Sequence, residues 1–274
     1  MWKAIGASVA GRSHEAAGKG CEDASGWLAE PGLTCLAVAD GAGSRPLSGT
    51  GAAFAVRRAL RLAMQSARCP ETGDPAACLR LIFQDVREQI TAMAKEDGND
   101  VGDYATTLAV MILAGDMLGL GQVGDTIAVV GCRGQYETVA PAPRYEYVNE
   151  TTFITDDSAL EQLRITARPS VEVDAVFLST DGLRFKILAD LAAATPFVPF
   201  FDDLQAYVRS PGASEDSVRR FLAGIEDQSG DDKTLVATVR TGFPTEFGDG
   251  GHQAGRQEGA GQHDGAGRHR LRVS

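Results

Sequence analysis

The chain has 274 residues, 43% of them hydrophobic, and a formal net charge of −11. This length can bury the core of one large domain or at most two small ones, and the acidic balance disfavours DNA or RNA as a partner. The five cysteines include no C-x-x-C pair, so the chain lacks the usual zinc-binding spacing and fits a reducing compartment better than a disulfide framework.

The beginning of the chain shows no targeting signal. Residues 1–15 contain no apolar core of the kind found in signal peptides, and no later apolar run approaches the ~18–20 residues that span a bilayer. We therefore expect a cytoplasmic protein with no membrane partner.

Short apolar runs bounded by turn residues predict six strands. The first covers residues 33–39. Residues 105–113, 117–123 and 126–130 follow as three successive strands, with tight turns supplied by Gly115-Asp116 and Gly124-Asp125. Two further apolar runs, 175–179 and 234–239, complete the set.

Helical periodicity predicts three helices, at residues 51–67, 75–95 and 215–226. The first two adjoin in sequence, so we expect an antiparallel pair that covers a sheet. The third has Ser214 as its predicted N-cap, and its predicted inward face consists of Val218, Phe221, Leu222 and Ile225.

Strands in hairpin-like groups and helices in separate blocks indicate an α+β fold of antiparallel sheets with helices outside. The predicted domain covers residues 1–242. Residues 243–274 are rich in Gly, Gln, His and Arg, and such a segment buries too little apolar surface to offset its ordering entropy. We predict that it is a disordered tail.

Aspartates beside glycines recur where predicted strands begin or end. They occur at Asp40-Gly41, Gly124-Asp125 and Asp181-Gly182, and at Gly230-Asp231-Asp232 before the last strand. Any one such pair indicates only a turn. Four at strand ends suggest carboxylates gathered at one rim, where their mutual repulsion would favour hard cations such as Mg²⁺, Mn²⁺ or Ca²⁺. Ions bridged by a carboxylate indicate hydrolysis or transfer at phosphate.

At this point the sequence resembles the metal-dependent protein phosphatases, the type 2C serine/threonine phosphatases. Six short segments carry the resemblance, and their shared order gives it weight. They are Cys21-Glu22-Asp23-Ala24, Val38-Ala39-Asp40-Gly41-Ala42-Gly43, Ala105-Thr106-Thr107-Leu108, Val123-Gly124-Asp125-Thr126, Leu178-Ser179-Thr180-Asp181-Gly182-Leu183 and Gly230-Asp231-Asp232-Lys233-Thr234-Leu235.

The resemblance implies a four-layer αββα sandwich and two Mn²⁺ or Mg²⁺ ions. Asp40 would bridge the ions, the Gly41 carbonyl would bind the second, and Asp181 and Asp231 would complete the first. Glu22 would hold metal-bound water, with support from Asp23. Asp125 resembles the ligand of a third, weaker ion in bacterial members. The implied reaction is direct attack by metal-bound hydroxide, with no phosphoenzyme.

Two departures concern the residues that handle the phosphate. Many members have a histidine after the Asp-Gly pair, often proposed as the general acid, where this chain has Ala42. Many also have an arginine shortly before the Glu-Asp pair, where only Lys19 is basic here. Arg12, Lys19 and His14 are therefore the candidates for phosphate contact, and His14 also for proton donation. A surface-loop position is the alternative interpretation of His14.

The predicted activity is hydrolysis of phosphoserine or phosphothreonine on a protein, with a kinase or a kinase substrate as the expected target. We expect a monomer. Two alternatives stay open. One is a weakly active or inactive regulator that binds phosphoproteins on the same fold, because Ala42 and the absent arginine weaken the catalytic case. The other is a small phosphate ester as substrate, because residues 125–181 leave little room for a substrate-facing flap.

Overall fold

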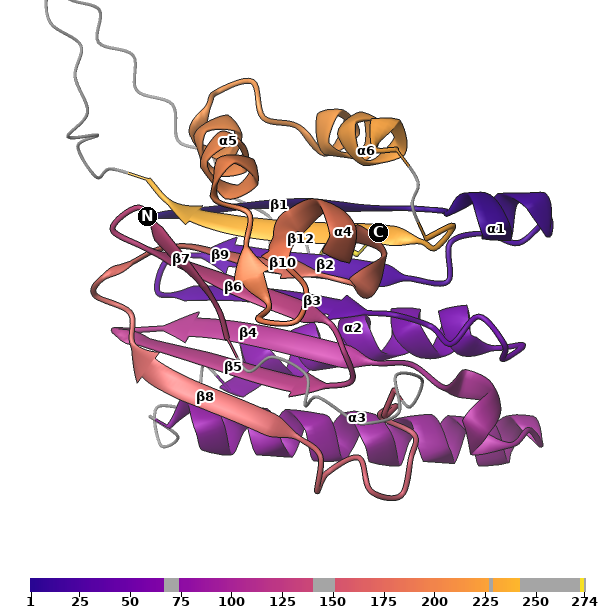
Figure 1. Ribbon diagram of the computed structural model, residues 1–274. Helices are drawn as coiled ribbons and strands as arrows, with labels where there is room; N and C mark the ends of the chain where they lie inside the picture. Colours follow the sequence, from indigo (N-terminus) through magenta and orange to yellow (C-terminus); the bar gives the residue numbers. More distant parts are fainter. Residues whose placement is uncertain (67–73, 140–150, 227–228, 242–271, 274) are drawn as a thin grey trace, which may run out of the picture.

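Two antiparallel sheets are stacked face to face in the computed structural model, which describes residues 1–66, 74–139, 151–226, 229–241 and 272–273 (Figure 1). Sheet A contains, in spatial order, β1 (Trp2–Val9), β12 (Lys233–Arg240), β9 (Val173–Ser179), β6 (Ile127–Cys132) and β7 (Gln135–Thr138). Sheet B contains β13 (Arg272–Val273), β2 (Ala24–Glu30), β3 (Leu33–Ala39), β4 (Leu108–Ala114), β5 (Met117–Val123) and β8 (Arg164–Pro169). The predicted antiparallel sheets are confirmed.

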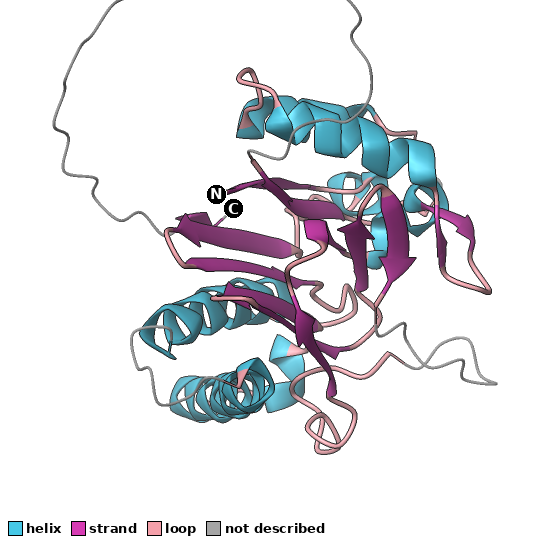
Figure 2. Cartoon of the chain, turned by 90° about the vertical axis from the view of Figure 1, so that its left-hand side faces the viewer, coloured by secondary structure: helices cyan, strands magenta, loops and turns pink. Residues whose placement is uncertain are grey.

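Helices cover the outer face of each sheet and complete four layers (Figure 2). Sheet B is covered by α2 (Ser48–Ser66) and α3 (Pro75–Asp97), and sheet A by α5 (Val198–Arg209) and α6 (Glu215–Gly224). Shorter elements are α1 (Arg12–Ala16), α4 (Arg184–Ile187), the 3₁₀ turns η1 (Val101–Tyr104) and η2 (Asp181–Leu183), and the hairpin of β10 (Leu188–Asp190) and β11 (Thr195–Pro196). The predicted αββα sandwich is therefore confirmed.

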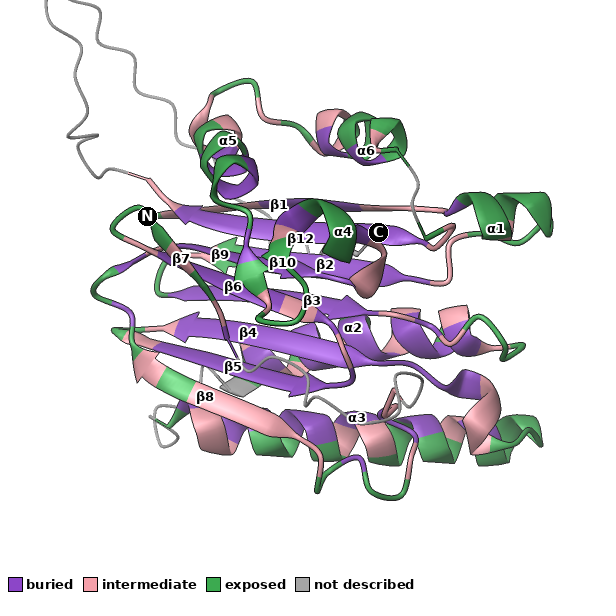
Figure 3. Ribbon diagram, in the orientation of Figure 1, coloured by how far each residue is buried: buried purple, intermediate pink, exposed green. Residues whose placement is uncertain are grey.

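The core has three layers, and β3 shows how the sequence divides between two of them. Its side chains alternate sides, as those of any strand do. Leu36 and Val38 belong to the core between the two sheets, whereas Cys35 and Ala37 face α2 and α3. All seven residues of β3 are buried (Figure 3), which explains why every position except Thr34 is apolar instead of alternating with polar residues.

The predicted helices exist, with shifted ends. For α3, the Asp74 side chain accepts a hydrogen bond from the Ala76 N–H at 2.8 Å, and Gly98 ends the helix with a φ of 71°. Capping of this kind fixes both ends of a helix. In α6, Ser214 accepts from the Ser217 N–H as predicted, but the helix ends at Gly224 instead of residue 226. The predicted helix at 51–67 begins earlier, at Ser48, and residue 67 lies outside the described part of the chain.

One predicted connection is wrong. The prediction of three successive strands joined by tight turns holds for β4 and β5, which pair directly around Gly115. At Gly124, however, the chain leaves sheet B and continues as β6 in sheet A, so Gly124-Asp125 is a crossover between sheets. Gly124 has a φ of 100°, which only glycine adopts readily. The turn residues were recognised correctly, but local sequence does not specify which sheet receives the next strand.

Other expectations fall largely outside the described residues. The predicted disordered tail, 243–274, is described only at Arg272 and Val273, which pair with Trp27 and Gly26 at the edge of β2. Part of the segment predicted to contain a reduced flap, residues 140–150, is likewise not described. None of the helices in the described ranges is long and apolar enough to cross a membrane.

Candidate functional site

Two of the strand-end aspartates lie at the same end of sheet B. Asp40 follows β3 directly, and Asp125 follows β5 after one glycine. Both strands pair antiparallel with β4, so they run parallel to each other. Their carboxyl ends therefore lie at one edge of the sheet, as the pairing of Leu108, at the start of β4, with Val123 shows.

The other two aspartates lie at the matching end of sheet A. Asp181 opens η2 just after β9, and Asp231 stands two residues before β12. These two strands are antiparallel neighbours, with Leu235 opposite Ser179, so the end of one meets the beginning of the other. A hydrogen bond of 2.8 Å from Thr180 Oγ1 to Asp23 Oδ2 joins this end of sheet A to the start of β2 in sheet B.

The carboxylates of these aspartates raise one another's pKa. Burial raises the pKa of Asp40, and repulsion from Asp23, Asp181, Asp231 and Asp125 raises it further. Burial is also the first cause for Asp181, followed by Asp125 and Asp231, and together they raise its pKa to about 6 against the opposing effect of Arg184. Asp231 is thus close enough to Asp40 for its charge to raise the pKa of Asp40, although the two residues are far apart in sequence.

The oxygen-only donor set fits a hard divalent cation. Mutually repelling carboxylates are stabilised when a cation lies between them, and oxygen ligands favour Mg²⁺ or Mn²⁺ over softer ions. Among the described residues, no three histidine, cysteine, aspartate or glutamate side chains already form a closed ligand group.

The backbone of Asp40 is fixed by two neighbouring threonines. The Asp40 N–H donates to Thr107 Oγ1 at 2.9 Å, and the Asp40 carbonyl accepts from Thr106 Oγ1 and from the Thr107 N–H, also at 2.9 Å each. Both threonines are fully buried. The segment that contains them was recognised in the sequence without a role, and the structure assigns it the positioning of Asp40.

Asp232 is a site residue that sequence reasoning missed. Its side chain is buried, and its two oxygens accept hydrogen bonds from the backbone N–H groups of Gly11 at 2.8 Å, Glu22 at 2.6 Å and Asp23 at 3.3 Å. His14 Nδ1 lies 2.8 Å from Asp232 Oδ1. One buried carboxylate therefore connects the start of β12 with α1 and with the Glu22-Asp23 pair. The doubled aspartate at 231–232 was the only signal in the sequence.

His14, Glu22 and Lys19 form a small group beside this carboxylate. His14 Nε2 lies 3.4 Å from Glu22 Oε2, and the two side chains are only 13% and 14% exposed. Lys19 Nζ donates to Glu22 Oε1 at 3.3 Å and to the Gly43 carbonyl at 2.8 Å. The surface-loop interpretation of His14 is therefore wrong, because the residue lies on α1 and faces two acidic side chains.

Two of the glycines beside the aspartates are required by close packing. A Cβ on Gly41 would lie 2.6 Å from the Glu22 carbonyl oxygen, and a Cβ on Gly182 would clash with the Asp232 carbonyl oxygen. Contacts this short exclude any side chain at either position without a backbone shift. The Asp-Gly pairs thus allow neighbouring loops to approach one another at the site.

Arg12 lies beside the carboxylate cluster, in the wall of a neighbouring pocket. It lines a separate pocket of about 380 Å³ with residues of β1, α6 and β12, and none of the clustered aspartates contributes to that pocket. The prediction grouped Arg12 with Lys19 as phosphate contacts. The structure places Lys19 beside Glu22 and Arg12 on a different wall, although both residues belong to the α1 region.

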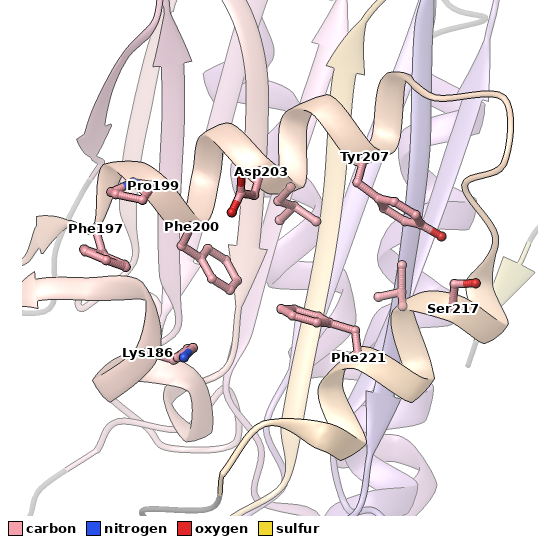
Figure 4. Close-up of a pocket in the computed structure, with 10 residues that line it drawn as sticks. Lys186, Phe197, Pro199, Phe200, Asp203, Tyr207, Ser217 and Phe221 are labelled. Carbon is pink, nitrogen blue, oxygen red and sulfur yellow. The ribbon is translucent and has the colours of Figure 1, made fainter.

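A larger cavity of about 510 Å³ lies between α5 and α6, away from all the predicted site residues (Figure 4). Phe200 and Phe221 face each other there, with ring centroids 6.1 Å apart. Phe221 was predicted to point inward, and this is wrong: its side chain is 47% exposed and lines the cavity. Periodicity placed it on the apolar stripe of α6, but only Val218 and Leu222 of that helix reach the core.

Comparison with known proteins identifies relatives of this arrangement. The sequence model of the family described as Protein phosphatase 2C matches residues 10–223. Serine/threonine-protein phosphatase 3 of Escherichia coli (strain K12) is 29% identical over 250 residues, which cover 87% of this chain and 98% of that protein.

Solved structures share the fold. A bacterial serine phosphatase superposes with a TM-score of 0.64 at 16% identity, covering 89% of this chain and 100% of that one. The catalytic domain of the serine threonine protein phosphatase PstP, in complex with two manganese ions, superposes with a TM-score of 0.57 at 19% identity, covering 87% of this chain and 97% of that one. At these identities the likeness is one of fold.

Proposed function

Because this chain belongs to the protein phosphatase 2C family, we infer that its carboxylate cluster is the active site of a metal-dependent phosphoprotein phosphatase. The proposed substrates are phosphoserine and phosphothreonine side chains, and the cofactor is Mn²⁺ or Mg²⁺. The observation that carries this proposal is the gathering of Asp40, Asp125, Asp181 and Asp231 from two sheets into one mutually repelling group.

The proposed ligands follow from that group. Asp40 would bridge two ions, the Gly41 carbonyl would bind the second, and Asp181 and Asp231 would complete the first. Asp125, whose Oδ2 accepts a hydrogen bond from Thr151 Oγ1 at 2.9 Å, would bind a third. When bound, such ions lower the pKa of a coordinated water and neutralise phosphoryl oxygens.

Three further residues would act on the attacking water and on the phosphate of the substrate. Glu22 is held by Lys19 and by its backbone hydrogen bond to Asp232, so its carboxylate can accept a proton from the attacking water and keep that water in place. Asp23, hydrogen-bonded to Thr180, supports Glu22 from the buried side. Lys19, whose side chain is 40% exposed, would attract the phosphate.

His14 is the proposed proton donor to the leaving oxygen. Its Nδ1 lies 2.8 Å from Asp232 Oδ1, so this side of the ring faces a buried carboxylate, and Nε2 is the nitrogen that would pass a proton to the substrate. Relatives in which a histidine follows the Asp-Gly pair would have their general acid on a different loop. In this chain Ala42 occupies that position, and its methyl group cannot donate a proton. His14 would take over the role from α1.

The decisive experiment measures phosphate release from p-nitrophenyl phosphate and from a phosphoserine peptide, with Mn²⁺ and with EDTA. Activity should require the metal.

Asp40→Asn should lower kcat/KM at least about a hundredfold, because the bridging charge is worth several kcal/mol and each 1.36 kcal/mol is tenfold. Asp203→Asn, at an exposed carboxylate on α5, is the matched control. Metal-independent turnover, or an Asp40 variant as active as the control, would overturn the proposal. The inactive-regulator alternative predicts peptide binding without turnover.

The role of His14 has its own test, which depends on the leaving group. p-Nitrophenolate leaves without protonation, whereas a serine alkoxide requires a proton. His14→Ala should therefore slow hydrolysis of the phosphoserine peptide by about 10²–10⁴-fold and that of p-nitrophenyl phosphate far less. Equal losses on both substrates would assign His14 to positioning instead.

The proposed target, oligomeric state and cellular location are argued from the sequence and from the relatives. Phosphoproteins are the substrate class, and a serine/threonine kinase or its substrate is the proposed target. A monomeric state and a cytoplasmic location are part of the same proposal. Gel filtration tests the first, and cell fractionation tests the second.

A further inference from the structure

A buried lysine that has no acidic partner among the described residues lies beside the proposed active site. Lys233 begins β12, directly after Asp231 and Asp232, and its side chain is only 5% exposed. Its Nζ makes one hydrogen bond, to the Ile225 carbonyl at 3.3 Å. No carboxylate of the described residues lies within 4 Å of it. An ammonium has three donors, and a buried charge is costly unless it is paired.

Lys233 lines the pocket of about 380 Å³ introduced above with Arg12. The walls come from the end of β1, from α1, from α6 and from the start of β12, so four segments distant in sequence enclose it. Arg12 and Arg219 lie on its walls with Lys233, and Glu15 is the single acidic residue there. Arg219 is also paired with Asp216, whose Oδ1 lies 3.4 Å from Nη1. Even with that carboxylate counted, three cations exceed two acidic groups, so the pocket is positive although the chain as a whole carries a net charge of −11.

The pocket adjoins the proposed active site through the backbone. Gly11, next to Arg12, donates its N–H to Asp232 at 2.8 Å, and Lys233 follows Asp232 in the chain. An extended peptide advances about 3.3–3.6 Å per residue. A peptide whose phosphorylated residue lies at the carboxylate cluster can therefore reach this pocket with a side chain a few residues away.

We propose that the pocket formed by Arg12, Arg219 and Lys233 is a subsite for an acidic residue that flanks the phosphorylated residue of the substrate. The inference rests on the proposed phosphatase function and names a substrate preference. The carboxylate of the flanking residue would pair with Lys233, for which the described part of the chain supplies no carboxylate, while the two arginines would add charge-assisted hydrogen bonds. The pocket size admits a side chain and not a folded domain.

The experiment compares phosphoserine peptides that differ only by Glu or Gln at each of positions two to four on either side of the phosphoserine. The measured quantity is the ratio of kcat/KM for the Glu peptide to that for the matching Gln peptide. We expect a ratio of about ten or more at one of these positions, reduced toward one in high salt because screening weakens exposed charges.

Lys233→Met and Arg219→Gln should each bring that ratio close to one. Arg219 is 47% exposed on α6, so its variant should fold even if the buried substitution does not. Arg220→Gln is the matched control, since Arg220 is the next residue on α6 and does not line the pocket. Thermal melts verify folding of each variant.

Two results would overturn the subsite. One is a ratio near one in the parent protein at every position. The other is an unchanged ratio in both Lys233→Met and Arg219→Gln. If no phosphopeptide is hydrolysed at all, the proposed function fails instead, and calorimetric binding of the non-phosphorylated Glu peptide to the parent and to Arg219→Gln still decides the subsite. Equal inhibition by free glutamate and by the Glu peptide would show a general anion site and reject the peptide assignment.

Discussion

Replacing Asp232 with alanine should destabilise the protein more than any change at an exposed carboxylate. The substitution removes the acceptor for the backbone N–H groups of Gly11, Glu22 and Asp23, which lie 2.8, 2.6 and 3.3 Å from its oxygens. Each buried donor left without a partner costs about 1–3 kcal/mol. Partial rehydration at Glu22, which is 14% exposed, lowers the sum, so we expect a loss of about 3–5 kcal/mol.

Such a loss is a large part of the 5–15 kcal/mol by which a domain is typically stable. Urea unfolding followed by the fluorescence of Trp2 and Trp27 measures it, and EDTA in all samples removes any contribution of bound metal. Asp232→Asn retains one acceptor oxygen and should cost about 1–2 kcal/mol. Asp203→Ala on the surface of α5 should change stability by less than about 0.5 kcal/mol. A loss below about 1 kcal/mol for Asp232→Ala would refute the anchoring role.

Three further predictions concern the scaffold. Asp74→Ala removes the side-chain cap that accepts from the Ala76 N–H and should cost about 1 kcal/mol in the same urea assay; Asp74→Ser, which can still cap, should restore most of it. Phe83→Ala empties a fully buried position whose ring packs against Gly121 of β5 and should cost about 3–5 kcal/mol, whereas exposed Leu81→Ala on the same helix should cost far less; similar losses would contradict the packing argument. Gly182→Ala pushes a methyl group into the Asp232 carbonyl and should lower metal-dependent turnover through displacement of Asp181, while Gly212→Ala, which meets nothing within 4 Å, should leave turnover unchanged.

The sequence by itself determined most of the elements and the chemical type of the site. The strand at 33–39 and the strand at 117–123 were predicted with their observed bounds, because an apolar run between turn residues has few other conformations. The aspartates at strand ends and their glycines were visible for the same reason. Oxygen ligands and a phosphatase-like motif order then predicted a hard metal ion at a site that joins distant segments.

Some features of the molecule are visible only in the tertiary structure, and all of them depend on contacts between residues that are distant in sequence. No local pattern indicates that β6 joins the other sheet, that Asp232 binds three backbone N–H groups, or that Phe221 remains exposed. Lys233 is an ordinary lysine in the sequence and an enclosed cation in the structure. Periodicity and turn chemistry act between residues a few positions apart, whereas these features depend on which distant surfaces pack together. Tertiary packing decides that choice, because the free energy of each contact is gained only when both partners are buried at the same place.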